Sequence, residues 1–295
     1  MTHFSALGRR LAAGLLAAAA GLTVVQAGPA MAAGSASVPT PEARAAGVEP
    51  DNARMGWRQH QVGEAVRPRS FAGARTQLAT PQATFVPTGV LGIDVSSWQG
   101  NVNWTAQAAL GKRFAYVKAT EGLTYKNPYF RSQYNGSYQA GLIRGAYHFA
   151  RPAKSSGKQQ AAYFAKSGGG WSADGHTLPG VLDIEYNPYG STCYGLTRSQ
   201  MVSWVKSFIT EYKRLTKRDA VIYTTTDWWT RCTGNTTVFS KTNPLWLARY
   251  GTTTPGKLPG AWTWATFWQY SATPIDQNRF SSSYSRLIVL AKNAS

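Results

Sequence analysis

Residues 179–186 are Pro-Gly-Val-Leu-Asp-Ile-Glu-Tyr, a short apolar run that ends with two acids. Side chains of an extended strand alternate between its faces, so Asp183 and Glu185 are expected on one side, one pleat apart. Two carboxyls that share one space repel each other, and burial adds to this effect, so their pKa values move apart. One proton donor beside one anion is the arrangement that breaks a glycosidic bond. The alternative is that both acids form ion pairs with Arg or Lys at the end of the strand. For an isolated Asp-x-Glu tripeptide, this alternative is the more common one.

Apolar runs of strand length alternate with helical patterns through the last two thirds of the chain. The expected strands are residues 90–95, 114–119, 143–149, 181–185, 220–223, 245–248 and 266–270. The expected helices are residues 104–110, 128–140, 156–166 and 197–215, the last with Thr197 as N-cap. This order predicts parallel strands joined by right-handed crossovers. The later connections are too short for helices, so we predict an α/β barrel that begins as β/α repeats and ends with bare strands.

Further acids follow other predicted strands. Asp94 ends the first strand, Glu121 follows the second, and Asp276 follows the run from Trp268 to Tyr270. The C-terminal ends of the strands of a closed barrel meet at one mouth, where active sites of such barrels lie. We therefore expect these acids to meet in space although they are distant in sequence.

The N-terminal third of the chain differs in composition. Residues 1–32 predict a signal peptide, with Arg9-Arg10 before an apolar stretch and a small-x-small site at Ala30–Ala32. The expected location is therefore extracellular, and the export pathway stays open. Residues 33–87 are rich in Ala, Pro, Gly, Arg and Gln, which predicts a disordered linker or propeptide. Residues 88–295 carry ten of the eleven tryptophans and are expected to form a single catalytic domain.

The net charge indicates which partners the protein could bind, and the cysteines indicate its redox environment. Residues 88–295 contain 23 Lys and Arg but nine Asp and Glu, an excess of 14 positive charges. Such an excess concentrates a protein at polyanions such as bacterial wall polymers, acidic lipid or nucleic acid, with simple solubility as the alternative. Cys193 and Cys232 are the two cysteines. In an oxidising location an even pair is expected to form a disulfide, and two free thiols are the alternative.

Seven segments together resemble those of glycoside hydrolase family 25, the Chalaropsis-type lysozymes. They are Gly92–Gly100 (GIDVSSWQG), Tyr116–Gly122 (YVKATEG), Gly145–Phe149 (GAYHF), Leu182–Glu185 (LDIE), Leu245–Ala248 (LWLA), Trp268–Tyr270 (WQY) and Ile275–Phe280 (IDQNRF). They span the folded part in the family's order. The resemblance implies an eight-stranded (β/α)5(β)3 barrel and N-acetylmuramidase activity on the β-1,4 bond between N-acetylmuramic acid and N-acetylglucosamine in peptidoglycan.

The resemblance also implies roles for the acids. Glu185 is expected to be the general acid that protonates the leaving oxygen. Asp183 is expected to act at C1, either by orienting and stabilising the substrate's own acetamido group or by direct attack. Asp94 and Asp276 are expected to support the pair. The two-residue spacing of Asp183 and Glu185 fits both the retaining and the inverting separation of carboxyls, so it does not decide the stereochemistry.

Aromatic residues at strand ends are candidates for a sugar platform, because rings stack on the apolar faces of pyranoses. These candidates are Tyr147, Tyr186, Tyr223, Trp246, Tyr250 and Trp268, and Glu121 is a further substrate-binding candidate. Ordinary packing in the barrel is the alternative for each ring. His148 follows Tyr147 directly, so it is expected on the other face, in the core.

Two other functions remain to be weighed against a lysozyme. One is a wall- or glycan-binding protein that has lost catalysis, and the other is a basic nucleic-acid binder. Intact Asp183 and Glu185 argue against the first, and the lack of a long Lys/Arg run or recognition motif argues against the second. No His-Glu-x-x-His, Gly-x-Ser-x-Gly or phosphate-binding glycine loop is present. We expect a monomer without cofactor or metal, acting on peptidoglycan and contacting anionic wall polymers, with no nucleic-acid or membrane partner.

Overall fold

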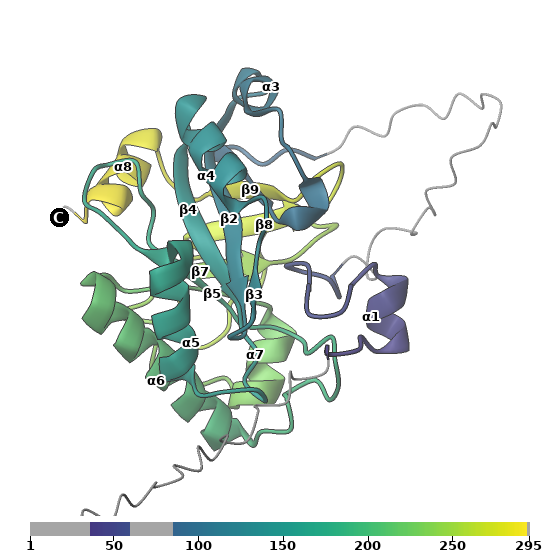
Figure 1. Cartoon of the computed structure of the whole chain (residues 1–295). Coiled ribbons are helices and arrows are strands. Elements are labelled where there is room, and N and C mark those ends of the chain that lie inside the picture. Colours follow the sequence, from purple (N-terminus) through teal and green to yellow (C-terminus); the bar gives the residue numbers. More distant parts are fainter. Residues whose placement is uncertain (1–35, 60–84, 294–295) are drawn as a thin grey trace, which may run out of the picture. The chain divides into compact units, whose positions relative to one another are not determined.

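Eight strands of the described residues close into a barrel (Figure 1). They are β1 (Val90–Val95), β2 (Lys112–Glu121), β4 (Ile143–Phe149), β5 (Val181–Asp183), β6 (Val221–Thr224), β7 (Leu245–Ala248), β8 (Phe267–Ser271) and β9 (Gln277–Phe280). Neighbouring strands are parallel from β1 through β8, and β9 is antiparallel to both β8 and β1. A ninth strand, β3 (Tyr125–Lys126), pairs with the end of β2. The structure is a computed structural model that describes residues 36–59 and 85–293.

Each of the first five barrel strands is followed by a helix. These helices are α3 (Trp104–Ala109), α4 (Phe130–Gln139), α5 (Gly157–Phe164), α6 (Arg198–Thr216) and α7 (Thr226–Thr233). Strands β7, β8 and β9 follow one another without helices, and α8 (Tyr284–Lys292) closes the described chain. The short elements are α1 (Pro41–Ala45), the 3-10 turn η1 (Ser97–Gln99) and the π turn η2 (Ala165–Gly169). The predicted (β/α)5(β)3 barrel is confirmed.

Alternating burial explains why these sequences form a closed sheet. In β5, Val181 packs into the barrel interior while Leu182 packs against the surrounding helices. The same alternation places Tyr223 inside and Ile222 outside in β6. Because both faces are covered, the strands are almost continuously apolar, as expected for parallel sheets. Asp183 continues the inward register of Val181, so the barrel itself aims this acid into the mouth.

The elements that the sequence analysis missed are short and include α7, α8 and β9. Strand β9 has the sequence Gln-Asn-Arg-Phe, which lacks the apolar run of the other strands. Helix α7 has eight residues and begins at the N-cap Thr225, whose hydroxyl accepts from the Trp228 N–H at 3.1 Å. The longer α6 has the predicted Thr197 N-cap, with a capping box to Gln200. Strong periodicity therefore predicted the long elements, and tertiary contacts decide the short ones.

The expectation of a disordered segment does not describe residues 36–59. Ala43, Ala53, Met55 and Trp57 are buried there, and they belong to the same apolar clusters as the barrel residues. Composition alone underestimated this order because the segment buries its apolar side chains against the barrel rather than against itself. The predicted signal peptide, residues 1–32, and the stretch 60–84 lie outside the described residues. No helix of the described part is both long and apolar enough to cross a bilayer.

Cys193 and Cys232 form the predicted disulfide, which closes a loop between α7 and the chain ahead of α6 across 39 positions. A cross-link over a loop of this length stabilises the fold mainly by restricting the unfolded chain. We expect the Cys193→Ser, Cys232→Ser double variant to lose ~2–4 kcal/mol of unfolding free energy in urea denaturation. Reductant should lower the stability of the wild type and leave the double variant unchanged. An equal response of both proteins would contradict a stabilising role.

Candidate active site

Asp183 and Glu185 lie at the C-terminal end of β5, and both side chains are 0% exposed. Neither carboxylate forms an ion pair with any of the described residues. Both Asp183 oxygens and Oε2 of Glu185 lack a hydrogen-bond partner within the described part of the chain. The alternative of acids bound to Arg or Lys is therefore wrong for this pair. Buried acids without partners are costly for a fold, which is typical of functional sites.

Burial shifts the proton affinity of both acids. It raises the pKa of Asp183 well above its ordinary value, and the negative charge of Glu185 raises it further. Burial also raises the pKa of Glu185, to about 8, although the Gly56 N–H that binds this carboxylate opposes the shift. The interaction between them shows that the two carboxyls share one environment. The pair can therefore hold and transfer protons near neutral pH.

Asp94 ends β1 and is fixed by two amides from the last two strands. Its Oδ2 accepts hydrogen bonds from Gln269 Nε2 at 2.8 Å and from Asn278 Nδ2 at 2.7 Å. Burial raises the pKa of Asp94 to about 6, and the two amides oppose that rise. The sequence analysis did not select Gln269 or Asn278, although both stand in the segments that resemble family 25. The sequence feature that could have identified them is an amide side chain at an inward-facing position of a strand that reaches the acidic mouth.

Asp276 lies directly before β9, and its carbonyl oxygen accepts from the Asp94 N–H at 3.3 Å. The charge of its side chain is among the causes, after burial, that raise the pKa of Tyr147 and Tyr250. Asp276 therefore lies at the same mouth as Asp94, Asp183 and Glu185. The four acids proposed from the sequence meet there from β1, β5 and the β8–β9 connection.

Glu121 has a different environment. Its carboxylate pairs with Lys118 Nζ at 2.7 Å and Arg151 Nη1 at 2.8 Å, and it also accepts from Tyr189 Oη at 2.8 Å. Burial by itself raises the pKa of Glu121, but the charges of Lys118 and Arg151 outweigh it, so the pKa lies below its ordinary value. A fourth contact comes from the Ala53 N–H at 2.8 Å. Glu121 is thus an ionised anchor in an ion-pair cluster rather than an open sugar-binding group.

Three of the aromatic candidates lie beside the acids. The hydroxyls of Tyr223 and Tyr250 both donate to Gln269 Oε1 at 2.6 Å, so they help to fix the amide that holds Asp94. Tyr147 is buried, and the charges of Asp94 and Asp183 raise its pKa further after burial. These three rings line the mouth next to the acids.

The other three aromatic candidates have packing partners elsewhere. Trp246 fills the barrel interior below the mouth, with its ring centre 4.9 Å from that of Tyr116, and its Nε1 donates to Asn278 Oδ1 at 3.0 Å. Trp268 faces away from the inward Gln269 and donates to the Arg249 carbonyl at 2.9 Å. Tyr186 donates to Asp227 at 2.7 Å. The structure therefore does not bring Trp246 or Trp268 to an exposed platform.

His148 lies on the outer face of β4, as expected. It is fully buried between the rings of Phe164 and Phe208, and its ring nitrogens contact Thr120 and Gln160. Burial lowers its pKa to about 4, so it stays neutral. In the described part of the chain, no group of three or more His, Cys, Asp or Glu side chains is arranged to hold a metal ion.

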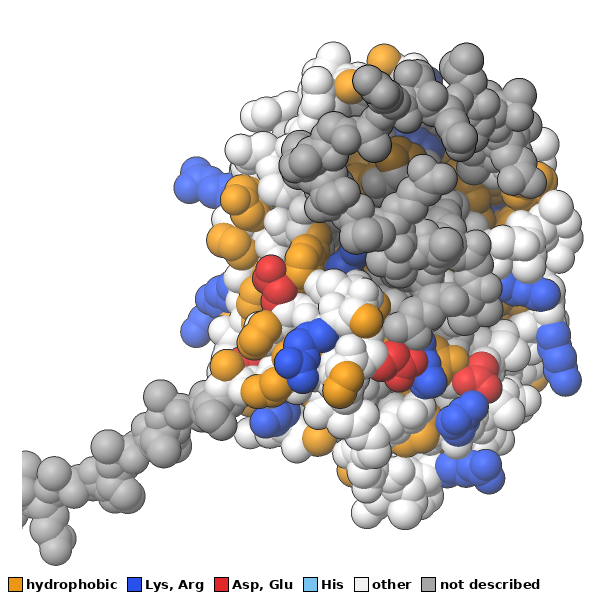
Figure 2. All heavy atoms as spheres, turned by 90° about the vertical axis from the view of Figure 1, so that its right-hand side faces the viewer, with side chains coloured by type: hydrophobic (Ala, Val, Ile, Leu, Met, Phe, Trp, Pro, Cys, Tyr) orange, Lys and Arg blue, Asp and Glu red, His pale blue; other side chains and the backbone are white. Residues whose placement is uncertain are grey.

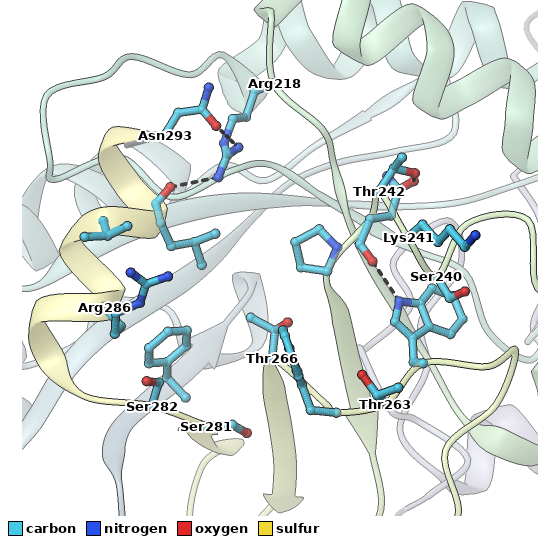
Figure 3. A pocket seen from close by; sticks show the side chains of 17 residues that line it. Arg218, Ser240, Lys241, Thr242, Thr263, Thr266, Ser281, Ser282, Arg286 and Asn293 are labelled. Carbon is cyan, nitrogen blue, oxygen red and sulfur yellow. Dashed lines mark hydrogen bonds between the residues drawn. The ribbon is translucent and has the colours of Figure 1, made fainter. Parts of the chain in front are cut away.

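A cavity of about 650 Å³ lies at the other end of the barrel (Figure 3). Its lining includes Asn243 and Pro244 before β7, Thr266 before β8, and Ser281 after the antiparallel β9. These positions are at the N-terminal ends of the parallel strands, away from the acids. Arg218, Lys241 and Arg286 contribute to its lining, which contains no carboxylate side chain. The cavity therefore lacks the groups for acid-assisted hydrolysis.

Comparison with known proteins agrees with this geometry. The sequence pattern of Glycosyl hydrolases family 25 matches residues 93–278. The chain belongs to this family. It is therefore a glycoside hydrolase, and the match contains Asp94, Asp183, Glu185 and Asp276.

Three relatives illustrate the similarity. Lysozyme M1 from Streptomyces globisporus is 44% identical over 308 residues and covers 99% of both chains. An N,O-diacetylmuramidase from Chalaropsis sp is 48% identical over 185 residues, which are 62% of this chain and 88% of that protein. The crystal structure of a bacterial lysozyme from Streptomyces coelicolor is 51% identical with a TM-score of 0.69, and it covers 70% of this chain and 99% of that chain.

The hydrogen bonds to Asp94 generate a prediction about its proton affinity. Asn278→Ala removes an N–H that stabilises the Asp94 anion, so the pKa of Asp94 should rise above about 6. A lost hydrogen bond to a charged group corresponds to about one to two pKa units. Carbon-13 NMR titration of the Asp carboxyls measures this shift. Arg279→Ala, one residue further on the opposite face of β9, serves as control, and an unchanged Asp94 titration in Asn278→Ala would refute the coupling.

Proposed function

We propose that this family 25 glycoside hydrolase is a secreted lysozyme that cleaves the β-1,4 bond between N-acetylmuramic acid and N-acetylglucosamine in bacterial peptidoglycan. The observation that carries the proposal is the buried pair Asp183 and Glu185, which has no ion-pair partner among the described residues. The names of the relatives support the substrate, since they are a lysozyme and an N,O-diacetylmuramidase.

In this proposal Glu185 donates its proton to the leaving glycosidic oxygen. Its raised pKa, about 8, keeps that proton available near neutral pH, which a general acid requires. Asp183 assists on the other side of C1, where its anion orients and stabilises the acetamido group of the muramic acid residue. Asp94 and Asp276 complete the acidic mouth, and Asp94 is held in place by Gln269 and Asn278. The acetamido oxygen bonds to C1 as the bond from C1 to the leaving oxygen breaks. Water then attacks C1, displaces the acetamido oxygen and returns one proton to Glu185.

Secretion and surface charge fit a wall substrate. The Cys193–Cys232 disulfide supports an oxidising, extracellular location, because such bridges are rare in the cytosol. Lys and Arg side chains are spread around the face shown in Figure 2, with few acids among them. We infer that this excess of positive charge draws the enzyme to anionic wall polymers. The monomeric state remains a prediction.

Replacing Glu185 tests its assignment as the general acid. Glu185→Gln keeps the size of the side chain but removes the transferable proton, so the rate of hydrolysis should fall by a factor of about 10² to 10⁴. The assay is the release of reducing ends from purified peptidoglycan, with mass spectrometry of the fragments. Asp219→Asn, which removes an acid just before β6 at the far end of the barrel, should keep the wild-type rate. Glycosidic cleavage that survives Glu185→Gln undiminished would refute the assignment.

The raised pKa of Glu185 also predicts how stability depends on pH. An acid whose folded-state pKa is raised stabilises the fold below its ordinary pKa, and this contribution is lost as the pH rises through the raised value. For Glu185 the window runs from 4.5 to about 8. The Tm of the wild type should therefore fall more steeply across this window than that of Glu185→Gln. Differential scanning calorimetry checks this, and parallel Tm curves would contradict the raised pKa.

A further inference from the structure

The mouth that holds the acids is already filled by the chain's own N-terminal segment. We call residues 36–59 the N-terminal plug. Its Gly56 N–H donates to Glu185 Oε1 at 2.5 Å. Its Ala53 binds the ion-pair cluster with both backbone groups, because the N–H donates to Glu121 and the carbonyl accepts from Lys118 Nζ at 2.6 Å. The plug thus contacts Glu185 and the cluster beside it directly.

Apolar side chains of the plug fill the space around these contacts. Met55 is 1% exposed and belongs to the apolar cluster that contains Tyr147 and Tyr223. Trp57 is 2% exposed, and its Nε1 donates to the Tyr186 carbonyl at 2.8 Å. Met55 therefore lies among the tyrosines that line the mouth, and Trp57 lies beside Tyr186, the residue that follows Glu185.

Polar contacts fasten the plug along its whole length. Arg151 donates to Ser37 Oγ at 2.7 Å and to Asp51 Oδ1 at 3.3 Å. The Thr40 N–H donates to the Pro188 carbonyl at 2.8 Å, beside α1. Figure 1 shows α1 in purple at the right-hand side, with the rest of the purple segment between it and the strands. The segment is therefore bound by the barrel as a peptide ligand would be.

The fit at Gly56 leaves no room for another group. Gly56 has a φ of +69°, and a Cβ there would lie 2.4 Å from Tyr250 Oη and 2.8 Å from Tyr223 Oη. In the reaction, the glycosidic oxygen must come within hydrogen-bond distance of Glu185. The Gly56 amide occupies that position at Oε1, and Oε2 is buried in the plugged mouth, so plug and substrate exclude each other.

We propose that the N-terminal plug, residues 36–59, is an intramolecular inhibitor that keeps the full-length chain latent, and that its departure from the mouth switches on hydrolysis. This proposal rests on the lysozyme function proposed above. The plug is separable in principle, because the Streptomyces coelicolor lysozyme is a complete fold that corresponds to only 70% of this chain. The barrel provides the catalytic groups, and the plug provides none of them.

Three substitutions in the full-length chain weaken the plug without altering the acids. Gly56→Val forces the contact with Tyr250, Trp57→Ala removes a buried ring, and Met55→Asp places a charge in an apolar cluster. We expect each to raise the initial rate of reducing-end release from peptidoglycan by at least about tenfold, since losses of this kind shift the bound fraction strongly. Arg44→Ala, an exposed position of the same segment, is the matched control and should leave the rate unchanged.

Two further measurements distinguish displacement of the plug from a direct effect on catalysis. Hydrogen exchange should become faster at residues 53–57 in the three variants while the barrel strands stay protected. A synthetic peptide of residues 36–59, added to the Gly56→Val chain, should lower the rate again, and the same peptide carrying Gly56→Val should not. Adding Glu185→Gln to the Gly56→Val chain should abolish turnover.

The proposal is overturned if none of the three substitutions raises the rate, or if Arg44→Ala raises it equally. It is also overturned if hydrogen exchange shows the plug displaced while the rate stays at the wild-type level; the lysozyme function then stands. A displaced plug with no turnover in any protein would instead overturn the proposed function, and the inhibitor with it.

Discussion

The main constraint on this structure is the burial of two carboxyls, Asp183 and Glu185, that have no counter-ion among the residues the structure describes. Glu121, another buried acid of the barrel, is neutralised in the ordinary way by Lys118 and Arg151. Asp183 and Glu185 are not, so the fold retains two groups that prefer water. The rest of the barrel has to be stable enough to hold them. Apolar packing on both faces of the strands and the Cys193–Cys232 bridge provide this stability.

The acids are positioned mainly by the alignment of neighbouring strands in the barrel. A side chain at the inward position of one strand meets the inward side chains of its neighbours at the same height. Asp94 on β1 therefore meets Gln269 on β8 and Asn278 on β9. The antiparallel direction of β9 matters here, because it brings the residues that follow Asp276 back along β1. A mouth built in this way is rigid before substrate arrives, which favours catalysis.

Much of this arrangement followed from the sequence, and the reasons are physical. The periodicity of the strands and of α6 predicted the barrel, and the position of Asp94 and Asp183 at strand ends predicted their meeting. The side-chain partners were harder to predict, since nothing local shows that Trp268 faces outward or that Glu121 is paired with Arg151. The order of residues 36–59 was not predicted, for a related reason. Their order depends on a surface made by residues more than a hundred positions away, such as Glu185 and Pro188.

The covalent tether of residues 36–59 to the barrel has a thermodynamic consequence. A tethered ligand is present at a fixed local concentration, so its occupancy does not depend on how much protein surrounds it. The fraction of chains with an occupied mouth would therefore be the same in a very dilute solution as in a concentrated one. Once the tether is broken, the same peptide is an ordinary solute, and outside a cell it drifts away and does not return. Cleavage of one peptide bond would thus turn reversible binding of the segment into its permanent loss.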